Sequence, residues 1–565
     1  MKKITAAIIV CAVLLFASCD GLSTGDAEAA QSEAEAIATA EYFSDGDMKD
    51  VSSQAENAVI TLEGDTGTIS DTTRGSSGTN VTVTSKGVYR ITGSSENVSV
   101  VVRDDNKSGN VYLILDNVTM SNSNYSCIAV EAAEKVIVTL VGENVLEYGV
   151  GSSDYDGAIY AEDDLTINGS GTLRITSTLH GIVCKNDLKI TGGVLTVDAS
   201  SVGLKAKDSV RIGGGSVTVV SGRDGIQISN SSGDSYFHIG GGSLDITAGY
   251  DGIDVGTSGD TMTGFANFGS GTVNIVSGGG SSGSKNTNIS QKGVKCDGKI
   301  IVSGAELTVN SADDALHSSA EVNITDGKVT LSSCDDGIHA DNVLGISGGT
   351  VTVEKSYEGL EAFEISISGG QISVTASDDG INAAGGSDTQ STESAPGRWS
   401  SSSGSSGKLT VSGGTLYVNA SGDGLDSNGS IYVTGGVVIV EGPENDGNGA
   451  LDTGDGSGCV AEITGGTVFA SGSSGMAVNF NSGTQCSALL SLSGSVGDVI
   501  SVDDGSGFTF TATKSFECAV YSSPSMEKGN SYTVKAGSSS AKADFSNGLY
   551  YSNVSSHGPG GFGGK

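Results

Sequence analysis

Hydrophobic and polar residues alternate in short runs along most of the chain, which is the pattern of half-buried β-strands. Two such runs separated by a Gly-Gly pair recur many times, as in Leu188-Lys-Ile-Thr-Gly-Gly-Val-Leu-Thr-Val197. No long segment keeps the 3.6-residue period of an amphipathic helix. We therefore expect an all-β protein with little helix.

A third short run accompanies each pair and contains a glycine followed by Ile, Leu or Val. The intervals between successive motif glycines are 24, 22, 22, 27, 41, 22, 22, 22, 21 and 44 residues. The motif positions are Gly157, Gly181, Gly203, Gly225, Gly252, Gly293, Ala315, Gly337, Gly359, Gly380 and Gly424. A unit of about 22 residues cannot bury its apolar face alone, so the units must stack. The repeat predicts a right-handed parallel β-helix with one coil of about 22 residues per repeat.

From Gly181 onward, the residue three positions after the motif glycine is small or apolar, as an inward-facing column requires. Cys184 and Cys296 belong to this column, and we interpret them as buried small hydrophobic residues. Two intervals are long, with extra residues near 256–290 and 384–407. Both insertions are expected to follow the strand that carries the motif glycine.

The N-terminus has the features of a secretory signal. Met1-Lys2-Lys3 precedes an apolar run that ends at Ala17, too short to span a membrane as a helix. Phe16-Ala17-Ser18-Cys19 is similar to a bacterial lipobox, so we expect residues 1–18 to be removed and Cys19 to carry lipid; ordinary signal cleavage nearby is the alternative. Residues 19–57 are acidic and rich in Ala and Ser, which predicts a flexible tether.

The repeat sets the expected domain boundaries. Residues 58–487 form the β-helix, with longer strands at its start that are candidates for an N-terminal cap. The 22-residue signal fades near residue 488, so 488–545 is predicted to be a small β cap that covers the last coil. Residues 546–565 are Gly-rich and are predicted to be a flexible tail.

The amino-acid composition excludes some protein classes and some kinds of binding partner. Of 565 residues, 87 are Gly and only 4 are Pro, without a Gly-X-Y period, which excludes a collagen. The net charge of −37 repels the negatively charged phosphate backbone of nucleic acids, so we expect no nucleic-acid partner. The chain should be a monomer that meets the membrane only through its lipid, on the cell surface or in the periplasm.

Acidic residues recur just before the motif glycine and therefore stack in successive coils. Two unit charges about 4.8 Å apart repel by about 3.5 kcal/mol at an effective dielectric constant of about 20. Calcium, which takes carboxylate and carbonyl oxygens, would relieve this repulsion; the alternative is that each Asp caps amides of its own turn in solvent. The candidate metal ligands are Asp313, Asp314, Asp335, Asp336, Glu358, Asp378, Asp379, Asp423 and Asp426.

A second column, two residues after the glycine, is polar and varied, as a recognition surface requires. His317 and His339 stack within it; they are interpreted as solvated surface rather than as transition-metal ligands. Sugars bind to flat aromatic rings and to hydrogen-bonding side chains. The candidate carbohydrate-binding residues are Tyr250, Tyr357, Trp399, His317, His339 and Glu361, although Trp399 could equally be a latch for the 384–407 loop.

Several stretches resemble one known family, the bacterial calcium-binding, polysaccharide-lyase-like β-helix proteins that are described as carbohydrate-binding domain proteins. The run from Gly157 to Leu173, followed by His180-Gly-Ile182, is the most specific match. Other matching stretches are Val111–Val118, Asp379–Gly386, Gly475-Met-Ala477 and Tyr521–Pro524. The resemblance covers roughly 58–540. It implies a β-helix, calcium and binding to plant-type polysaccharide, as clostridial members bind cellulose and polygalacturonate, and it does not imply catalysis.

The sequence thus predicts a lipid-anchored, calcium-loaded β-helix that binds cellulose or a pectin-like acidic glycan and is not an enzyme. One alternative is a calcium-dependent uronate lyase, for which Lys205, Lys295 and Arg223 are the available bases. A second alternative is a surface stalk or adhesin for protein partners.

Overall fold

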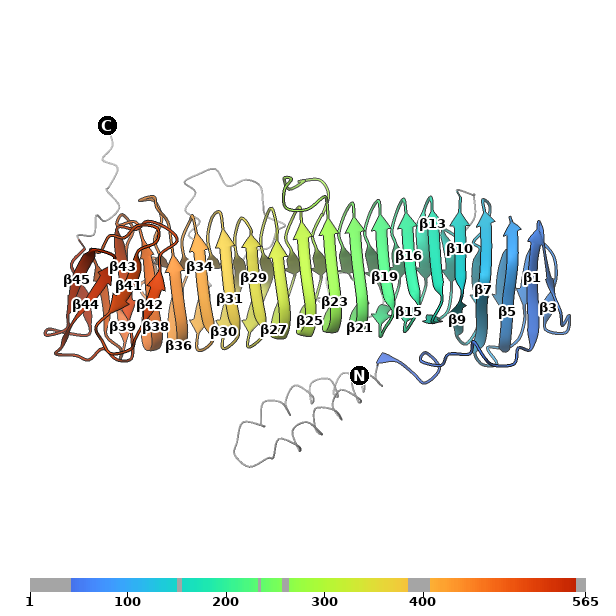
Figure 1. The fold of residues 1–565 in the computed structure, drawn as a ribbon, viewed down its shortest axis with the longest axis horizontal. Coiled ribbons are helices and arrows are strands. Elements are labelled where there is room, and N and C mark those ends of the chain that lie inside the picture. Colours follow the sequence, from blue (N-terminus) through green and yellow to red (C-terminus); the bar gives the residue numbers. More distant parts are fainter. Residues whose placement is uncertain (1–41, 150–154, 232–234, 257–263, 385–406, 555–565) are drawn as a thin grey trace, which may run out of the picture.

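The structure is a computed structural model that describes residues 42–149, 155–231, 235–256, 264–384 and 407–554. It is a long, straight solenoid of stacked β-strands with its N-terminal coils at one end and a C-terminal cap at the other (Figure 1). Neighbouring coils pair through parallel strands in a single large sheet. The predicted all-β parallel β-helix is confirmed.

Each coil contributes strands to three faces, which we call first, second and third in chain order. The first face carries the motif glycine. Its strands are β4 (Asn80–Val83), β6 (Ser99–Arg103), β8 (Ile128–Ala132), β11 (Gly157–Ala161), β14 (His180–Cys184), β17 (Leu204–Ala206), β20 (Ile226–Ser229), β22 (Ile253–Gly256), β24 (Val294–Cys296), β26 (Leu316–Ser318), the starts of β28 (Ile338–Ile346) and β30 (Leu360–Ile367), β32 (Ile381–Ala383), β35 (Leu425–Ser427) and β37 (Leu451–Thr453).

The second and third faces are formed by the two runs that flank the Gly-Gly corner. Several strands continue across that corner and belong to both faces. The strands of these two faces are β5 (Gly87–Glu96), β7 (Val111–Asn122), β9 (Val136–Val141), β10 (Glu143–Tyr148), β12 (Leu165–Gly169), β13 (Thr172–Ser177), β15 (Asp187–Ile190), β16 (Val194–Ala199), β18 (Ser209–Ile212), β19 (Ser216–Ser221), β21 (Ser235–Ala248), β23 (Gly264–Ser277), β25 (Lys299–Ser311), β27 (Glu321–Ser332), β29 (Thr350–Lys355), β31 (Gln371–Ala376), β33 (Lys408–Val411), β34 (Thr415–Ala420), β36 (Ser430–Glu441) and β38 (Ala461–Gly472), together with the ends of β28 and β30.

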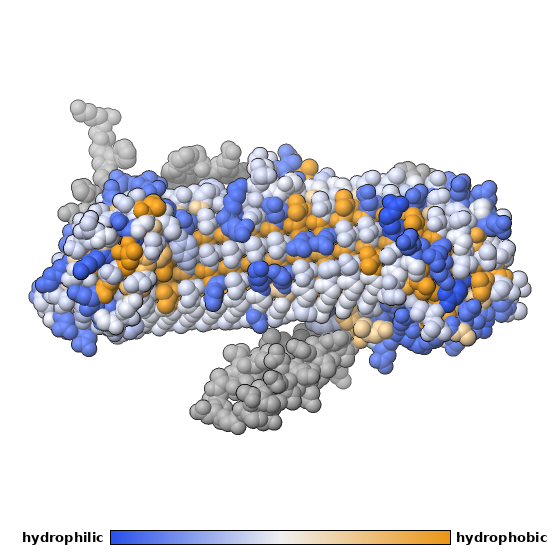
Figure 2. Space-filling model, in the orientation of Figure 1, coloured by the Kyte–Doolittle hydropathy of each residue, from blue (hydrophilic) through white to orange (hydrophobic). Residues whose placement is uncertain are grey.

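The core is one continuous column of aliphatic side chains that point inward from all three faces. On the first face, Cys184 pairs with Ala206 of the next coil, and both are buried, as the inward column predicts. A Cβ atom on Gly359 would lie 2.2 Å from the carbonyl oxygen of Gly380, so the close stacking of coils at this corner requires glycine. Figure 2 shows rows of hydrophobic side chains between polar ones along one side of the solenoid.

Antiparallel strands close both ends. At the N-terminal end β1 pairs antiparallel with β2, and β3 with β4, whereas the long strands β5 and β7 are ordinary parallel coils. At the C-terminal end β43 pairs antiparallel with β38 and so covers the last coil. The end strands are β1 (Ala58–Gly64), β2 (Thr66–Ile69), β3 (Gly75–Ser76), β39 (Ser482–Gly483), β40 (Ser487–Leu490), β41 (Val499–Val502), β42 (Thr509–Thr511), β43 (Cys518–Ser522), β44 (Ser531–Ala536), β45 (Ser539–Asp544) and β46 (Tyr550–Ser552).

Two segments predicted to be flexible have defined structure in part. Strand β46, inside the predicted tail 546–565, pairs in parallel with β40. Residues 42–57, the end of the predicted tether, lie against the second face; we call them the strap (Figure 1). Asp47 of the strap is fully buried and accepts hydrogen bonds from Lys135 at 2.8 Å and Thr166 at 2.7 Å. These contacts fix the strap because they compensate a buried charge.

The register differs from the sequence prediction in two places. Ile159 pairs with Ile182, so Ala158 rather than Gly157 occupies the position of Gly181, and the first interval is 23 residues rather than 24. The long interval after Gly252 is not a single insertion on the first face, because β23 (Gly264–Ser277) lies within it. Much of the added length, 278–293, comes instead after the third face, just before β24.

Candidate functional site

The polar column of the first face is continuous in the structure. Strand pairing places His317 beside His339, His339 beside Glu361, and Glu361 beside Asn382. The column then continues through Asp426 to Asp452. Sequence reasoning missed Asp452, although Ala450-Leu451-Asp452 repeats the pattern of Gly424-Leu425-Asp426 and signals one more coil.

The acids before the motif glycine make a ladder of hydrogen bonds between coils. Oδ1 of Asp379 accepts a hydrogen bond from the backbone N–H of Asp423 at 2.6 Å, and Oδ1 of Asp423 accepts one from Gly449. Asp251 and Asp314 accept equivalent bonds from Lys292 and Asp336. These four aspartates therefore cap amides of the following coil. Asp313 and Asp452 instead accept a hydrogen bond from the next amide of their own turn, as the alternative interpretation predicts. Each bond uses one carboxylate oxygen and leaves the second for another partner.

Two lysines offset the charge of the first part of the ladder: Lys285 from the long interval, and Lys292, which stands just before the motif residue Gly293. Asp313, Asp314 and Asp335 bring carboxylate oxygens within 4.8 Å of one another. Lys285 pairs with Asp313 at 3.1 Å and with Asp335, and Lys292 pairs with Asp313 at 3.4 Å and with Asp314. Burial alone would raise the pKa of Asp314, but Lys292 and His317 hold this pKa well below its usual value. We call these five residues the lysine cluster; its two ammonium groups offset two of its three carboxylate charges.

The stacked histidines are buried, which corrects their interpretation as solvated surface. Their rings lie 4.8 Å apart, and His339 is only 2% exposed. Nδ1 of His339 lies 3.0 Å from Asp336 Oδ2 and 2.8 Å from Glu361 Oε2, and Nε2 lies 3.2 Å from Asp341 Oδ1. Although burial opposes the charge, these three carboxylates raise the pKa of His339 strongly. The charged imidazolium thus occupies the centre of the acidic group that it contacts.

In the coils from Glu358 onward, a group of acids has, within the residue ranges that the structure describes, no neighbouring cationic side chain that offsets its negative charge. Among the described residues, no Lys, Arg or His forms an ion pair with Glu358, Asp378, Asp379, Asp423, Asp426 or Asp452. We call these six acids, together with Asn382, the acidic strip. Burial, reinforced by neighbouring carboxylates, raises the pKa of Glu358 to about 8, of Asp379 to about 6, of Asp423 to about 7 and of Asp426 to about 8. The strip therefore favours protons or another cation.

One buried polar atom in the acidic strip lacks a partner. Asn382 is 8% exposed, and its Nδ2 donates a hydrogen bond to Glu358 Oε2 at 2.6 Å. Its Oδ1 is buried and accepts no hydrogen bond from the described residues. A buried carbonyl oxygen without a donor costs free energy. The strip combines this oxygen with carboxylates, and both are the hard oxygen ligands that calcium takes. The strip thus offers the oxygen types that calcium takes. Among the described residues, the groups whose ligand atoms lie within 4.8 Å of one another are Asp313, Asp314 and Asp335, and Asp336, His339 and Glu361.

The predicted aromatic residues do not form one surface. Tyr357 is 47% exposed, and its hydrogen bond with Asp378 of the acidic strip raises its pKa. Tyr250 lies under the guanidinium of Arg223, whose central carbon is 5.2 Å from the ring centroid. Trp399 lies outside the described residues, as does the lipid-attachment residue Cys19. Tyr357 is thus the predicted ring that accompanies the strip.

The residues considered as lyase bases lie apart from the acidic strip, near Asp224, Asp251 and Asp254. Lys295 pairs with Asp254 at 3.3 Å. Burial alone would lower the pKa of Lys295, but Asp254 and Asp251 raise it above its usual value. A lysine held in its protonated form does not accept a proton, so this geometry does not favour Lys295 as a general base.

Comparison with known proteins supports the predicted resemblance. Residues 77–337 match the family described as "Carbohydrate-binding domain-containing protein". A protein of that name from Acetivibrio thermocellus is 35% identical over 127 residues, which are 21% of this chain and 44% of the relative. The match thus spans less than half of that relative. A solved structure, the polysaccharide lyase-like protein from C. thermocellum in its gadolinium derivative, is 26% identical with a TM-score of 0.35 and covers 51% of this chain and 96% of its own.

Proposed function

We propose that the protein binds polysaccharide on its first face through calcium held by the acidic strip. The single observation that carries the proposal is the set of stacked carboxylates from Glu358 to Asp452 that no cation of the described residues balances. The match of residues 77–337 to a carbohydrate-binding family supplies the class of ligand. A pectin-like acidic glycan or cellulose is the proposed partner.

In this proposal, calcium connects the acidic strip to the bound polysaccharide. The strip offers carboxylates from successive coils and the carboxamide oxygen of Asn382, and calcium accepts six to eight oxygens in a flexible shell. An ion bound there would lower the repulsion among the strip carboxylates, and its remaining positions are suited to hydroxyl or carboxylate oxygens of a sugar. The exposed ring of Tyr357 would then pack against the apolar face of a pyranose.

The place of action is also part of the proposal. An N-terminal signal and a lipid on Cys19 would hold the solenoid at the cell envelope, where polysaccharide is met. Among the residues that the structure describes, no helix is long and apolar enough to span a membrane.

Retention on insoluble glycans tests the proposal. Purified protein is mixed with cellulose or with polygalacturonate gel, in calcium or in chelator, and the bound fraction is measured. We expect retention in calcium and its loss in chelator. The variant D379N/D426N should lose retention in calcium, whereas the control D105N/D326N, which removes two exposed acids away from the strip, should keep it. Retention on neither glycan would contradict the proposal, and so would equal retention of both variants.

A further inference from the structure

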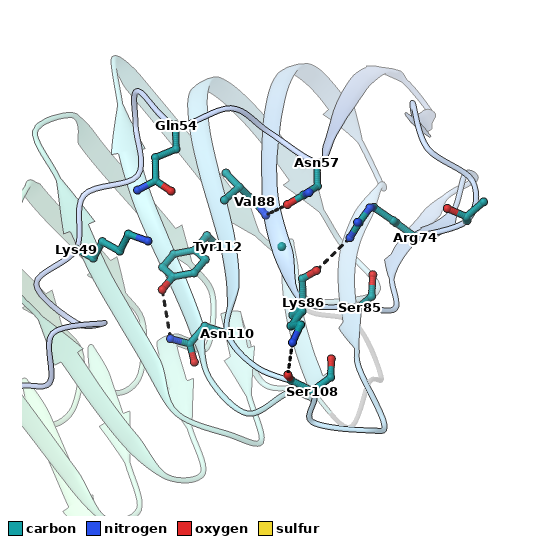
Figure 3. A pocket seen from close by; sticks show the side chains of 12 residues that line it. Lys49, Gln54, Asn57, Arg74, Ser85, Lys86, Val88, Ser108, Asn110 and Tyr112 are labelled. Carbon is teal, nitrogen blue, oxygen red and sulfur yellow. Dashed lines mark hydrogen bonds between the residues drawn. The ribbon is translucent and has the colours of Figure 1, made fainter.

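A cavity of about 780 Å³ at the N-terminal end of the solenoid has a chemistry opposite to that of the rest of the molecule (Figure 3). Three cationic side chains line it, Lys49 from the strap and Arg74 and Lys86 from the first coils, and its lining contains no acidic residue. The chain as a whole carries 66 acidic and 29 basic residues. A local group of cations in such an acidic chain creates a positive potential that attracts an anionic ligand.

The two lysines are held at the cavity by neutral partners. Lys86 Nζ donates to the carbonyl oxygen of Ser108 at 3.0 Å, and Lys49 Nζ lies 5.4 Å from the centre of the Tyr112 ring. Neither lysine forms an ion pair with a carboxylate in the described part of the chain. Arg74 donates to the carbonyl oxygen of Lys86 at 3.2 Å and pairs with Asp71 at 3.4 Å, outside the cavity lining. Two of the three charges are therefore available to a ligand.

The remaining lining suits a sugar rather than a bare anion. Figure 3 shows Gln54, Asn57 and Asn110 around the cavity, with Tyr112 beside Lys49. Oδ1 of Asn57 accepts a bond from the N–H of Val88 at 2.8 Å, and Asn110 Nδ2 donates to the Tyr112 hydroxyl at 3.3 Å. In the part of the chain that the structure describes, the other side-chain polar atom of Asn57 and of Asn110 forms no hydrogen bond and can meet a ligand. Carboxamides pair with hydroxyl groups, and a cavity of this volume falls in the usual range for small-ligand sites.

We propose that this cavity binds a segment of an acidic glycan, with Lys49 and Lys86 each facing a carboxylate of its sugar units and the carboxamides facing the hydroxyl groups. The inference rests on the proposed function for its ligand class but uses a separate site that needs no metal. Because Lys49, Gln54 and Asn57 belong to the strap, a bound sugar would also join the strap to the first coils.

Calorimetric titration of the full chain with trigalacturonate in chelator tests this site. Chelator removes calcium from the acidic strip, so failure here and failure of the strip are distinguishable. We expect K49Q/K86Q to weaken binding at least 10-fold, while K328Q/K542Q, which removes two exposed lysines elsewhere, changes it less than twofold. D379N/D426N should leave binding in chelator unchanged.

Neutral galactotriose and inorganic sulfate identify what the cavity recognises. We expect that neither galactotriose nor sulfate competes with trigalacturonate at equal concentration. Sulfate that binds as tightly as the trisaccharide would overturn a sugar site in favour of a general anion site. Absence of trigalacturonate binding in chelator would also overturn the proposal, as would equal weakening in the two double variants.

Discussion

Asn382 donates a hydrogen bond to Glu358 at 2.6 Å, and its own carbonyl oxygen is left buried without a donor among the described residues. The bond fixes the amide so that one polar atom is satisfied by protein and the other is not. Buried polar groups are almost always paired, by protein, water or an ion. Together with the unbalanced acids around it, this oxygen marks the coils where a cation is expected.

Removal of Lys292 should be strongly destabilising. Asp314 is fully buried and pairs with Lys292, so the variant K292M leaves a buried charge without its principal partner. Breaking a buried ion pair from one side costs about 3–5 kcal/mol. We expect a loss of this size in the free energy of unfolding, measured by urea denaturation. The control K299M breaks a half-exposed pair with Glu321 and should cost about 0–1 kcal/mol; equal effects would refute the role of the lysine cluster.

Loss of the Asp47 charge should release the strap. The variant D47N keeps the shape of the side chain but leaves Lys135 and Lys189 without their buried counter-charge. We expect trypsin to cleave after Lys49 at least 10-fold faster than in the wild type, with the coils still intact by mass spectrometry. The control D50N changes an exposed neighbour and should cleave at the wild-type rate. An unchanged rate in D47N would show that other contacts hold the strap.

Stability in chelator should fall as pH rises, in part because of Asp251. Burial, reinforced by Asp254, raises the pKa of Asp251 from 3.8 to about 7 in the folded state. The folded protein therefore binds a proton more tightly than the unfolded chain, so this stability is fully present below pH 4 and is lost as pH approaches about 7. The melting temperature of the wild type should decrease between pH 5 and 8. In D251N the decrease should be smaller; an equal decrease would mean that Asp251 does not titrate in this range.

The period of the sequence was enough to predict the fold and most of the register. A coil of constant length places equivalent residues over one another, which is why the pairs from Ile182 to Leu425 follow the motif glycine. The first of the listed repeats was misplaced by one residue because Ala158 stands where most later repeats have glycine. The period of a repeat predicts which column of the solenoid a residue belongs to. It does not predict which side chains that residue contacts.

The repeat alone could not predict the contact of the inserted lysine, the burial of His339 or the position of the strap. Lys285 lies in a long interval, and the length of that interval does not tell at which corner the extra residues leave the solenoid. The burial of His339 depends on Asp341 and Glu361, which surround it from its own and the next coil. The strap was also missed, because residues 42–57 have no repeat and contact coils more than 80 positions away in sequence.

Calcium titration by calorimetry tests the central claim most directly, with the wild type compared with D379N/D426N and with D105N/D326N. Our account predicts saturable binding to the wild type and the control, at least 10-fold weaker binding to D379N/D426N, and a melting temperature that calcium raises only in the first two. Absence of calcium binding to the wild type, or equal binding by all three proteins, would contradict the claim that the acidic strip holds calcium.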